Sequence, residues 1–261
     1  NLVFFRYLSS FLFLLIIFSI KKKSIQFPSL KTFLNILVIS ILYYIYNIFF
    51  FWGTDIGSAG LGGVFVTTTN PIVTFLIISI ISRSIEKYQI MGICLGALGG
   101  CIILNIFKLG ISSVFIGENL YFLVCSVTWG IITVVMTYGQ KNYDSISYII
   151  LCYMFTAIIS TFFIIPSEII DFGRYDMRFF INFFFVSIGA MCFGTSVYMY
   201  AAPRLGPIQT SVFIFTVPFI AMSTAYLILN EPIKIEVVIG GLLGILAVYT
   251  VNFSKGKLKK L

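Results

Sequence analysis

The stretch IGSAGLGGVFVTTTNPIVTFLIISIIS, residues 56–82, has no charged side chain and lies between Asp55 and Arg83. An α-helix rises about 1.5 Å per residue, so about 20 residues cross the hydrocarbon core of a bilayer. Seven further windows of 18 to 26 uncharged residues occur along the chain. A ninth apolar run covers about Leu2 to Ile20, with Arg6 near its start, and we expect its guanidinium to reach the headgroups. The pattern predicts nine membrane-spanning helices.

Composition supports the same fold class. Hydrophobic residues make up 59% of the 261 residues and charged residues only 10%, whereas soluble domains are about 25% charged. Runs such as residues 179–185 do not alternate polar and apolar residues as membrane-spanning strands do. We therefore predict an all-α polytopic membrane protein whose surroundings are the lipid bilayer.

Basic residues predict the orientation of these helices. If residues 21–31 face the cytoplasm, alternation of the spans places 12 of the 17 Lys and Arg on that side, including a basic tail at 255–261. The positive-inside rule favours this arrangement. The net charge of +8 then encodes topology, and the chain shows no nucleic-acid footprint. The multi-pass pattern is expected in a bacterial inner membrane.

An internal repeat follows from comparing distant segments. Ala59 matches Gly206 and Pro71 matches Pro218 at a constant offset of 147, and Gly92 matches Gly240 at 148. Chance similarity between apolar helices is the alternative, but the order of features over two consecutive spans favours duplication. We predict an N-terminal repeat at 1–106 and a C-terminal repeat at 117–254.

The offset also predicts a longer fold. The span at about 119–138 should have a partner that starts upstream of Asn1, which indicates a ten-helix protein whose first helix is missing from this chain. With five helices in each repeat, an odd number, the two repeats must insert with opposite orientations. Inverted repeats of this kind are typical of secondary transporters.

The chain resembles the drug/metabolite transporter superfamily, and in particular its EamA-type permeases. The resemblance rests on short motifs along most of the chain: Arg6-Tyr7, Ser58-Ala59-Gly60-Leu61, Asn70-Pro71, Gly117-Glu118-Asn119-Leu120, Ser126-Val127-Thr128-Trp129 and Leu229-Asn230-Glu231-Pro232. It implies ten helices, cytoplasmic termini and a central substrate cavity between the repeats. One departure is that the position matching Glu231 in the first half is Arg83, so that loop is expected to differ in role.

Neutral polar and aromatic residues within the spans are the candidates for a substrate cavity. A carboxylate relay and an enzyme active site are both disfavoured, because no ionisable side chain lies in the middle of a span and no nucleophile stands beside a base. Histidine is absent and the five cysteines form no CxxC pair, so we expect no metal and no cofactor. The cavity candidates are Asn47, Thr67, Asn70, Trp129, Tyr198 and Thr216.

Each candidate has a plainer alternative. Threonine hydroxyls in helices often bond to their own backbone, Asn70 could join helix to helix, and Tyr198 could serve only in packing. Pro71 and Pro218 are expected to kink their helices because proline removes a backbone hydrogen bond. Small residues at helical spacing predict close helix contacts, either between the repeats or at a homodimer seam; they are Gly92, Gly96, Gly100, Gly240 and Gly244.

The sequence thus favours a permease for a small neutral or zwitterionic metabolite, such as an amino acid or a related amphiphilic compound. We expect alternating access and prefer export, although the sequence leaves the direction open. The alternative is a membrane scaffold or partner protein that transports nothing.

Overall fold

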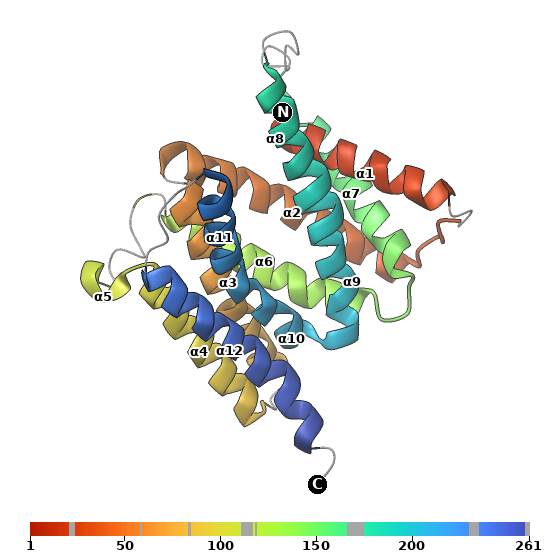
Figure 1. Cartoon of the computed structure of the whole chain (residues 1–261). Helices are drawn as coiled ribbons and strands as arrows, with labels where there is room; N and C mark the ends of the chain where they lie inside the picture. Colours follow the sequence, from red (N-terminus) through yellow and green to blue (C-terminus); the bar gives the residue numbers. More distant parts are fainter. Residues whose placement is uncertain are drawn as a thin grey trace. The chain divides into compact units, whose positions relative to one another are not determined.

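The computed structural model describes residues 1–20, 24–57, 59–82, 85–110, 117, 119–165, 175–229 and 235–258. Every regular element in these ranges is a helix (Figure 1). In the first half the helices are α1 (Leu2–Ile20), α2 (Leu30–Ile56), α3 (Ala59–Ser82), α4 (Lys87–Ile103) and the short α5 (Ile106–Leu109). The prediction of an all-α membrane protein is confirmed within these ranges.

The second half contains two composite helical segments between regular ones. It begins with α6 (Asn119–Gly139) and α7 (Ser145–Thr161) and ends with α12 (Ile235–Leu258). The first composite segment runs through α8 (Met177–Phe184), a π-helix (Phe185–Thr195) and α9 (Ser196–Leu205). The second runs through α10 (Pro207–Ser211), a 3-10 helix (Val212–Thr216) and α11 (Val217–Leu229).

Six helices of the described part are long and apolar enough to cross a membrane: α1, α2, α3, α6, the segment at 177–205 and α12. Three shorter apolar helices, at residues 87–103, 145–161 and 207–221, coincide with the other expected spans. The chain is therefore multi-pass, while the total of nine spans stays a prediction. Residues 21–23, Arg83, Glu231 and 259–261, which the sequence argument used, lie outside the described residues.

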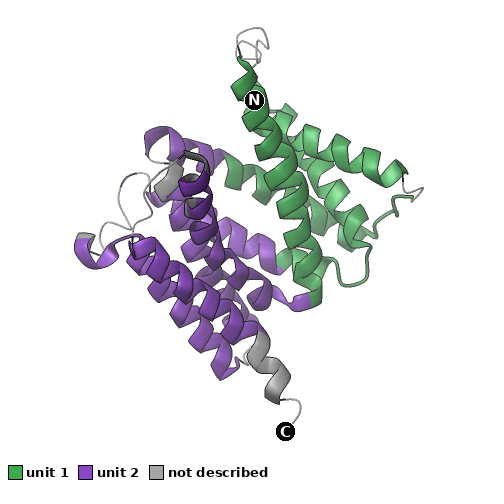
Figure 2. Ribbon diagram, viewed as in Figure 1, with its two compact units in different colours: residues 1–47, 135–204 green, residues 48–134, 205–261 purple. Residues whose placement is uncertain are grey.

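The chain divides into two compact units (Figure 2). Unit 1 comprises residues 1–47 and 135–204, and unit 2 comprises 48–134 and 205–261. Each unit takes segments from both predicted repeats, and the boundaries fall inside α2, inside α6 and at the last residue of α9. The predicted basic tail at 255–261 begins as a continuation of α12, whose backbone is helical to Leu258.

In unit 1, α1 packs against α7 and against the π-helix. Short polar caps start two of its helices, because the first backbone N–H groups of a helix have no partner within it. The Asp144 carboxylate accepts from Ser147 N at 2.8 Å and begins α7, and Asp176 accepts from Phe179 N at 2.9 Å and begins α8.

In unit 2, α4 and α12 lie side by side and approach closely at two glycines. A Cβ placed on Gly99 would lie 2.6 Å from the carbonyl oxygen of Gly240, and one on Gly240 would lie 2.5 Å from that of Gly99. Among the predicted glycines, Gly244 faces the Phe215 backbone in the same way, at 2.6 Å. These faces are covered within the unit itself, and Gly99 was not among the sequence candidates.

The other predicted glycines lie nearest to side chains. A Cβ on Gly92 would meet the Val251 side chain and, at 3.0 Å, the carbonyl oxygen of Ala247. One on Gly96 would meet the Phe215 ring, and one on Gly100 would meet Thr68. Around them, apolar residues of α3, α4, α12 and the 3-10 helix form a shared core, including Ile78, Ile93, Val212 and Ala247. The glycines thus lie where helices of unit 2 contact one another, and their contribution to assembly stays a prediction.

The two prolines sit in different local structures. Pro71 lies inside α3, which continues through it as an α-helix. Pro218 is the second residue of α11 and directly follows the change from a 3-10 helix to an α-helix at Thr216. A third proline, Pro203, lies inside α9 and was not among the sequence candidates.

Candidate substrate-binding regions

A polar seam joins α3 to α6 inside unit 2. The hydroxyls of Thr69 and Ser126 are in hydrogen-bond contact across the two helices. One turn further along α6, a Cβ on Gly130 would lie 2.6 Å from the Val73 side chain, so only a small residue allows the helices this close. The rings of Phe65 and Phe122 meet at 6.5 Å at the other end of the contact. Serine and glycine on α6 therefore let two apolar helices approach at a hydroxyl pair.

Most hydroxyls of this seam also donate to their own helix. Thr67 donates to the carbonyl of Gly63 at 2.7 Å and Thr69 to that of Phe65 at 2.8 Å. This is the plainer alternative that the sequence left open. A hydroxyl that donates in this way keeps its lone pairs for a second partner, so the arrangement is compatible with a cavity role for Thr67, which stays a prediction.

Asn70 lies at the centre of this region and is 2% exposed. Its side-chain oxygen accepts from the Thr74 hydroxyl at 3.3 Å. The next residue, Pro71, has no N–H to donate to the carbonyl of Thr67, which loosens the helix at the amide. Trp129 is half-buried on α6, one turn from Ser126. The structure thus packs the helices that carry Asn70 and Trp129 against each other, and a joint site stays a prediction.

The two remaining candidates of the second half are placed apart from this seam. Thr216 is half-buried at the end of the 3-10 helix in unit 2, where its hydroxyl donates to the Phe213 carbonyl at 2.7 Å. Tyr198 is half-buried on α9 in unit 1. Neither residue lines the apolar groove or the polar pocket of unit 1 that are described below.

Asn47 is the centre of a buried polar cluster in unit 1. It is 3% exposed, its side-chain oxygen accepts from Arg6 Nη1 at 2.9 Å, and its side-chain nitrogen donates to Tyr7 Oη at 3.0 Å. The same nitrogen donates to the carbonyl of Tyr43 at 2.9 Å. These three hydrogen bonds connect the Asn47 side chain to α1 and to its own helix, α2.

This cluster corrects the expectation for Arg6. The sequence predicted that its guanidinium would extend to the headgroups, but the structure turns it toward Asn47 on α2. The reason is that the Asn47 side-chain oxygen, 2.9 Å away, accepts a hydrogen bond from the guanidinium. This hydrogen bond replaces part of the hydration that the charged group would have at the membrane surface.

Three buried tyrosines surround the Arg6–Asn47 pair. The ring of Tyr7 lies 5.8 Å from that of Tyr43 and 5.7 Å from that of Tyr153. The Tyr153 hydroxyl donates to the carbonyl of Met191 at 2.8 Å and contacts the Ser196 hydroxyl at 3.1 Å. Tyr153 therefore connects the cluster to the π-helix and to α9.

Only part of this cluster could be recognised from the sequence. Asn47 was named, and Arg6-Tyr7 was noted only as part of a family motif. Tyr153 carried no signal, because one tyrosine in an apolar span is indistinguishable from a packing residue until its partners are known. The π-helix was equally invisible, although such wide turns often occur at functional sites.

Comparison with known proteins agrees with these features. The family model described as the EamA-like transporter family matches residues 1–105 and 116–253, as two repeats. A solved crystal structure is similar over 97% of this chain and 87% of its own, with a TM-score of 0.74 and 11% identity, which shows a shared fold. A search of curated proteins finds no match. The chain therefore belongs to the EamA-like transporter family, and it is a multi-pass membrane transporter of small compounds rather than an enzyme.

Proposed function

We propose that the chain transports a small neutral or zwitterionic metabolite, such as an amino acid or a related amphiphilic compound, by alternating access. The observation that carries this proposal is the hydroxyl and amide seam formed by Thr69, Ser126 and Asn70 inside unit 2. Polar groups inside a membrane protein are costly unless they have partners, and they commonly mark a substrate path. Neutral donors and acceptors suit polar groups of a substrate that carries no net charge.

A zwitterion with a carboxylate is favoured by the second region. Arg6 places a guanidinium within a span, and Asn47 orients it through one Nη atom. Guanidinium groups bind carboxylates through paired hydrogen bonds. The aromatic faces of the surrounding tyrosines suit an apolar or cationic part of the same compound. The two regions lie in different units, so each is assigned and tested by itself.

Alternating access is supported by the two family matches in one chain. Repeats of five helices insert with opposite orientations, and inverted repeats can exchange roles to open a site first on one side and then on the other. We propose export as the direction of transport.

The experiment is uptake and counterflow in liposomes that contain the purified full-length chain. A mixture of labelled amino acids, other zwitterions, and neutral, anionic and cationic metabolites is tested, with protein-free liposomes as the control. Accumulation of a neutral or zwitterionic compound that an excess of its unlabelled form inhibits supports the proposal. A chain that moves none of them behaves as a scaffold, and preference for a strong anion or cation contradicts the proposed substrate class.

A further inference from the structure

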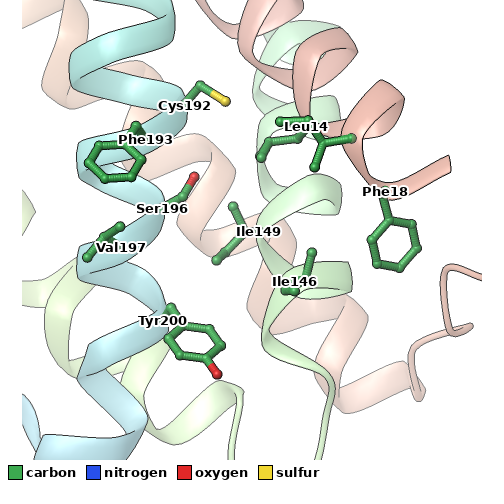
Figure 3. A pocket seen from close by; sticks show the side chains of 10 residues that line it. Leu14, Phe18, Ile146, Ile149, Cys192, Phe193, Ser196, Val197 and Tyr200 are labelled. Carbon is green, nitrogen blue, oxygen red and sulfur yellow. The ribbon is translucent and has the colours of Figure 1, made fainter. Parts of the chain in front are cut away.

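Unit 1 contains an apolar groove of about 280 Å³ that the transport proposal does not use. It lies between the last turns of α1, the first turns of α7 and the segment from the π-helix into α9 (Figure 3). Figure 3 shows the side chains of α1 and α7 on one side and those of the π-helix and α9 on the other. The lining is almost wholly hydrocarbon, with Leu14, Phe18, Ile149, Phe193 and Val197 among its side chains.

The groove opens on a face of the π-helix and α9 that unit 1 leaves uncovered. Phe193 is 72% exposed and Val197 is 51% exposed, and both are apolar. The polar atom of Ser196 is engaged by Tyr153. In a membrane-spanning chain such a face is in contact with lipid, so hydrocarbon chains are always available to fill it.

One end of the groove carries a fixed cation. The guanidinium of Arg204 lies 3.5 Å from the centre of the Tyr200 ring, and its Nη1 donates to the Tyr200 carbonyl at 2.6 Å and to the Ser145 hydroxyl at 3.1 Å. Tyr200 lines the groove, and Ser145 directly precedes its Ile146. Arg204 is thus held where the hydrocarbon lining ends.

A polar pocket of about 440 Å³ adjoins this end and includes Arg204, Lys141 and Asp144 in its lining. Within the part of the chain that the structure describes, no carboxylate lies within 4.0 Å of Arg204 or of Lys141. The Asp144 carboxylate instead accepts from Ser147 N at the start of α7. Burial and this carboxylate raise the pKa of the neighbouring Tyr143 hydroxyl, which stays neutral. The pocket therefore offers two cations beside one engaged anion.

We propose that the groove and the polar pocket together bind one anionic phospholipid. An acyl chain occupies the groove, and the phosphate is held by Arg204 and Lys141. Arginine and lysine suit a phosphate, the former through paired hydrogen bonds and the latter as a point charge. A zwitterionic lipid fits the groove but lacks the net negative charge that two cations favour. The continuity of apolar lining and cation along one path distinguishes this site from a general basic surface.

The test is native mass spectrometry of the delipidated full-length chain, titrated with phosphatidylglycerol and phosphatidylcholine that carry identical acyl chains. We expect one tightly retained phosphatidylglycerol, bound at least several-fold better than phosphatidylcholine. Arg204→Gln and Lys141→Gln should each lower that preference on the order of fivefold, since one basic residue near a membrane surface contributes about 1 kcal/mol. Val197→Trp, which fills the groove, should weaken both lipids.

Two controls and a fallback variant distinguish a specific lipid site from its alternatives. Lys87 begins α4 in unit 2 and lines neither the groove nor the polar pocket, so Lys87→Gln should leave the preference unchanged. Equal losses in Lys87→Gln would indicate a diffuse charge effect and overturn the site. Glycerol phosphate at millimolar concentration should not displace the lipid. If glycerol phosphate binds as tightly as the lipid and displaces it, the site holds a free phosphate and the lipid proposal is overturned. If Arg204→Gln unfolds because it loses the hydrogen bond to Ser145, the test rests on Lys141→Gln, since Lys141 is exposed.

Discussion

The guanidinium of Arg6 donates to the side-chain oxygen of Asn47 across 2.9 Å, and this contact joins α1 to α2 inside unit 1. Removing the amide leaves a charged donor in an apolar interior. Asn47→Ala should therefore lower the free energy of unfolding by about 1–3 kcal/mol, the cost of an unsatisfied buried group. Asn47→Asp keeps an acceptor and should retain most of the stability. Thermal unfolding in detergent measures both.

The matched control for this prediction is Asn252→Ala. Asn252 is a half-buried amide on α12 that donates to the carbonyl of Val248 at 3.1 Å and, more weakly, to that of Gln209 at 3.5 Å. Removing this amide leaves no charged group without an acceptor. Asn252→Ala should therefore lower the free energy of unfolding by less than Asn47→Ala. Equal melting temperatures for the two alanine variants would show that the Arg6 contact contributes nothing particular.

The glycine contact between α4 and α12 gives a second prediction. Gly99→Ala and Gly240→Ala each place a Cβ within about 2.6 Å of a backbone carbonyl that cannot rotate away, and overpacking of this kind costs about 1–3 kcal/mol. Gly96→Leu should also damage folding more than substrate choice. Gly63→Ala is the control, because a Cβ there meets nothing within 4 Å. Unfolding in detergent should show Gly63→Ala to be neutral or slightly stabilising, since alanine has a higher helix propensity than glycine. If Gly63→Ala is more destabilising than Gly99→Ala and Gly240→Ala, the close packing of α4 against α12 is contradicted.

The α3–α6 seam gives a third prediction, about transport. Asn70→Ala and Trp129→Phe should reduce the transport rate at least several-fold while expression and melting temperature hold, because both substitutions keep the spans apolar. The control is Thr224→Ala, which removes an exposed hydroxyl on α11 that bonds only to the Ile220 carbonyl. Normal transport by both seam variants, or failure only through misfolding, would remove the site assignment and leave the family assignment intact.

Tyr153 gives a fourth prediction. Tyr153→Phe keeps the ring contact with Tyr7 but removes the donor to the Met191 carbonyl on the π-helix. We expect a loss of about 0.5–1.5 kcal/mol in stability, the usual net value of one hydrogen bond. Hydrogen exchange should become faster at 185–195 in particular. Tyr226→Phe, at an exposed tyrosine of α11, should alter neither quantity. An unchanged rate of hydrogen exchange at the π-helix in Tyr153→Phe would show that the Tyr153 hydroxyl does not stabilise that segment.

Topology gives a fifth prediction. A cysteine at Ser24 should be protected from a membrane-impermeant reagent in intact cells, whereas one at Phe107, which is 72% exposed on α5, should react. The expectation follows from the asymmetry of the Lys and Arg residues. The opposite labelling pattern would show that the chain has the inverse orientation in the membrane.

The sequence predicts the elements better than their contacts, and the reason is physical. Charge-free windows must become helices because lipid offers no partner for backbone groups, so α1 appears at the residues expected from the sequence. Partners depend on how the helices cross. The spacing of Gly92, Gly96 and Gly100 pointed to one face of α4, but the closest approach to the backbone of α12 is at Gly99. Likewise, Arg6 and Asn47 are 41 residues apart, and no local pattern indicates that they meet.

The division of the chain also has a consequence for biosynthesis. Unit 1 consists of residues 1–47 and 135–204, so its last helices are made long after its first. At about 5–20 residues per second, synthesis of the intervening chain and the rest of the unit takes roughly 8–30 s. Arg6, Tyr7, Tyr43 and Asn47 all belong to the early part. Their hydrogen bonds are therefore available during the wait and can shelter the Arg6 charge before α7 and α9 leave the ribosome.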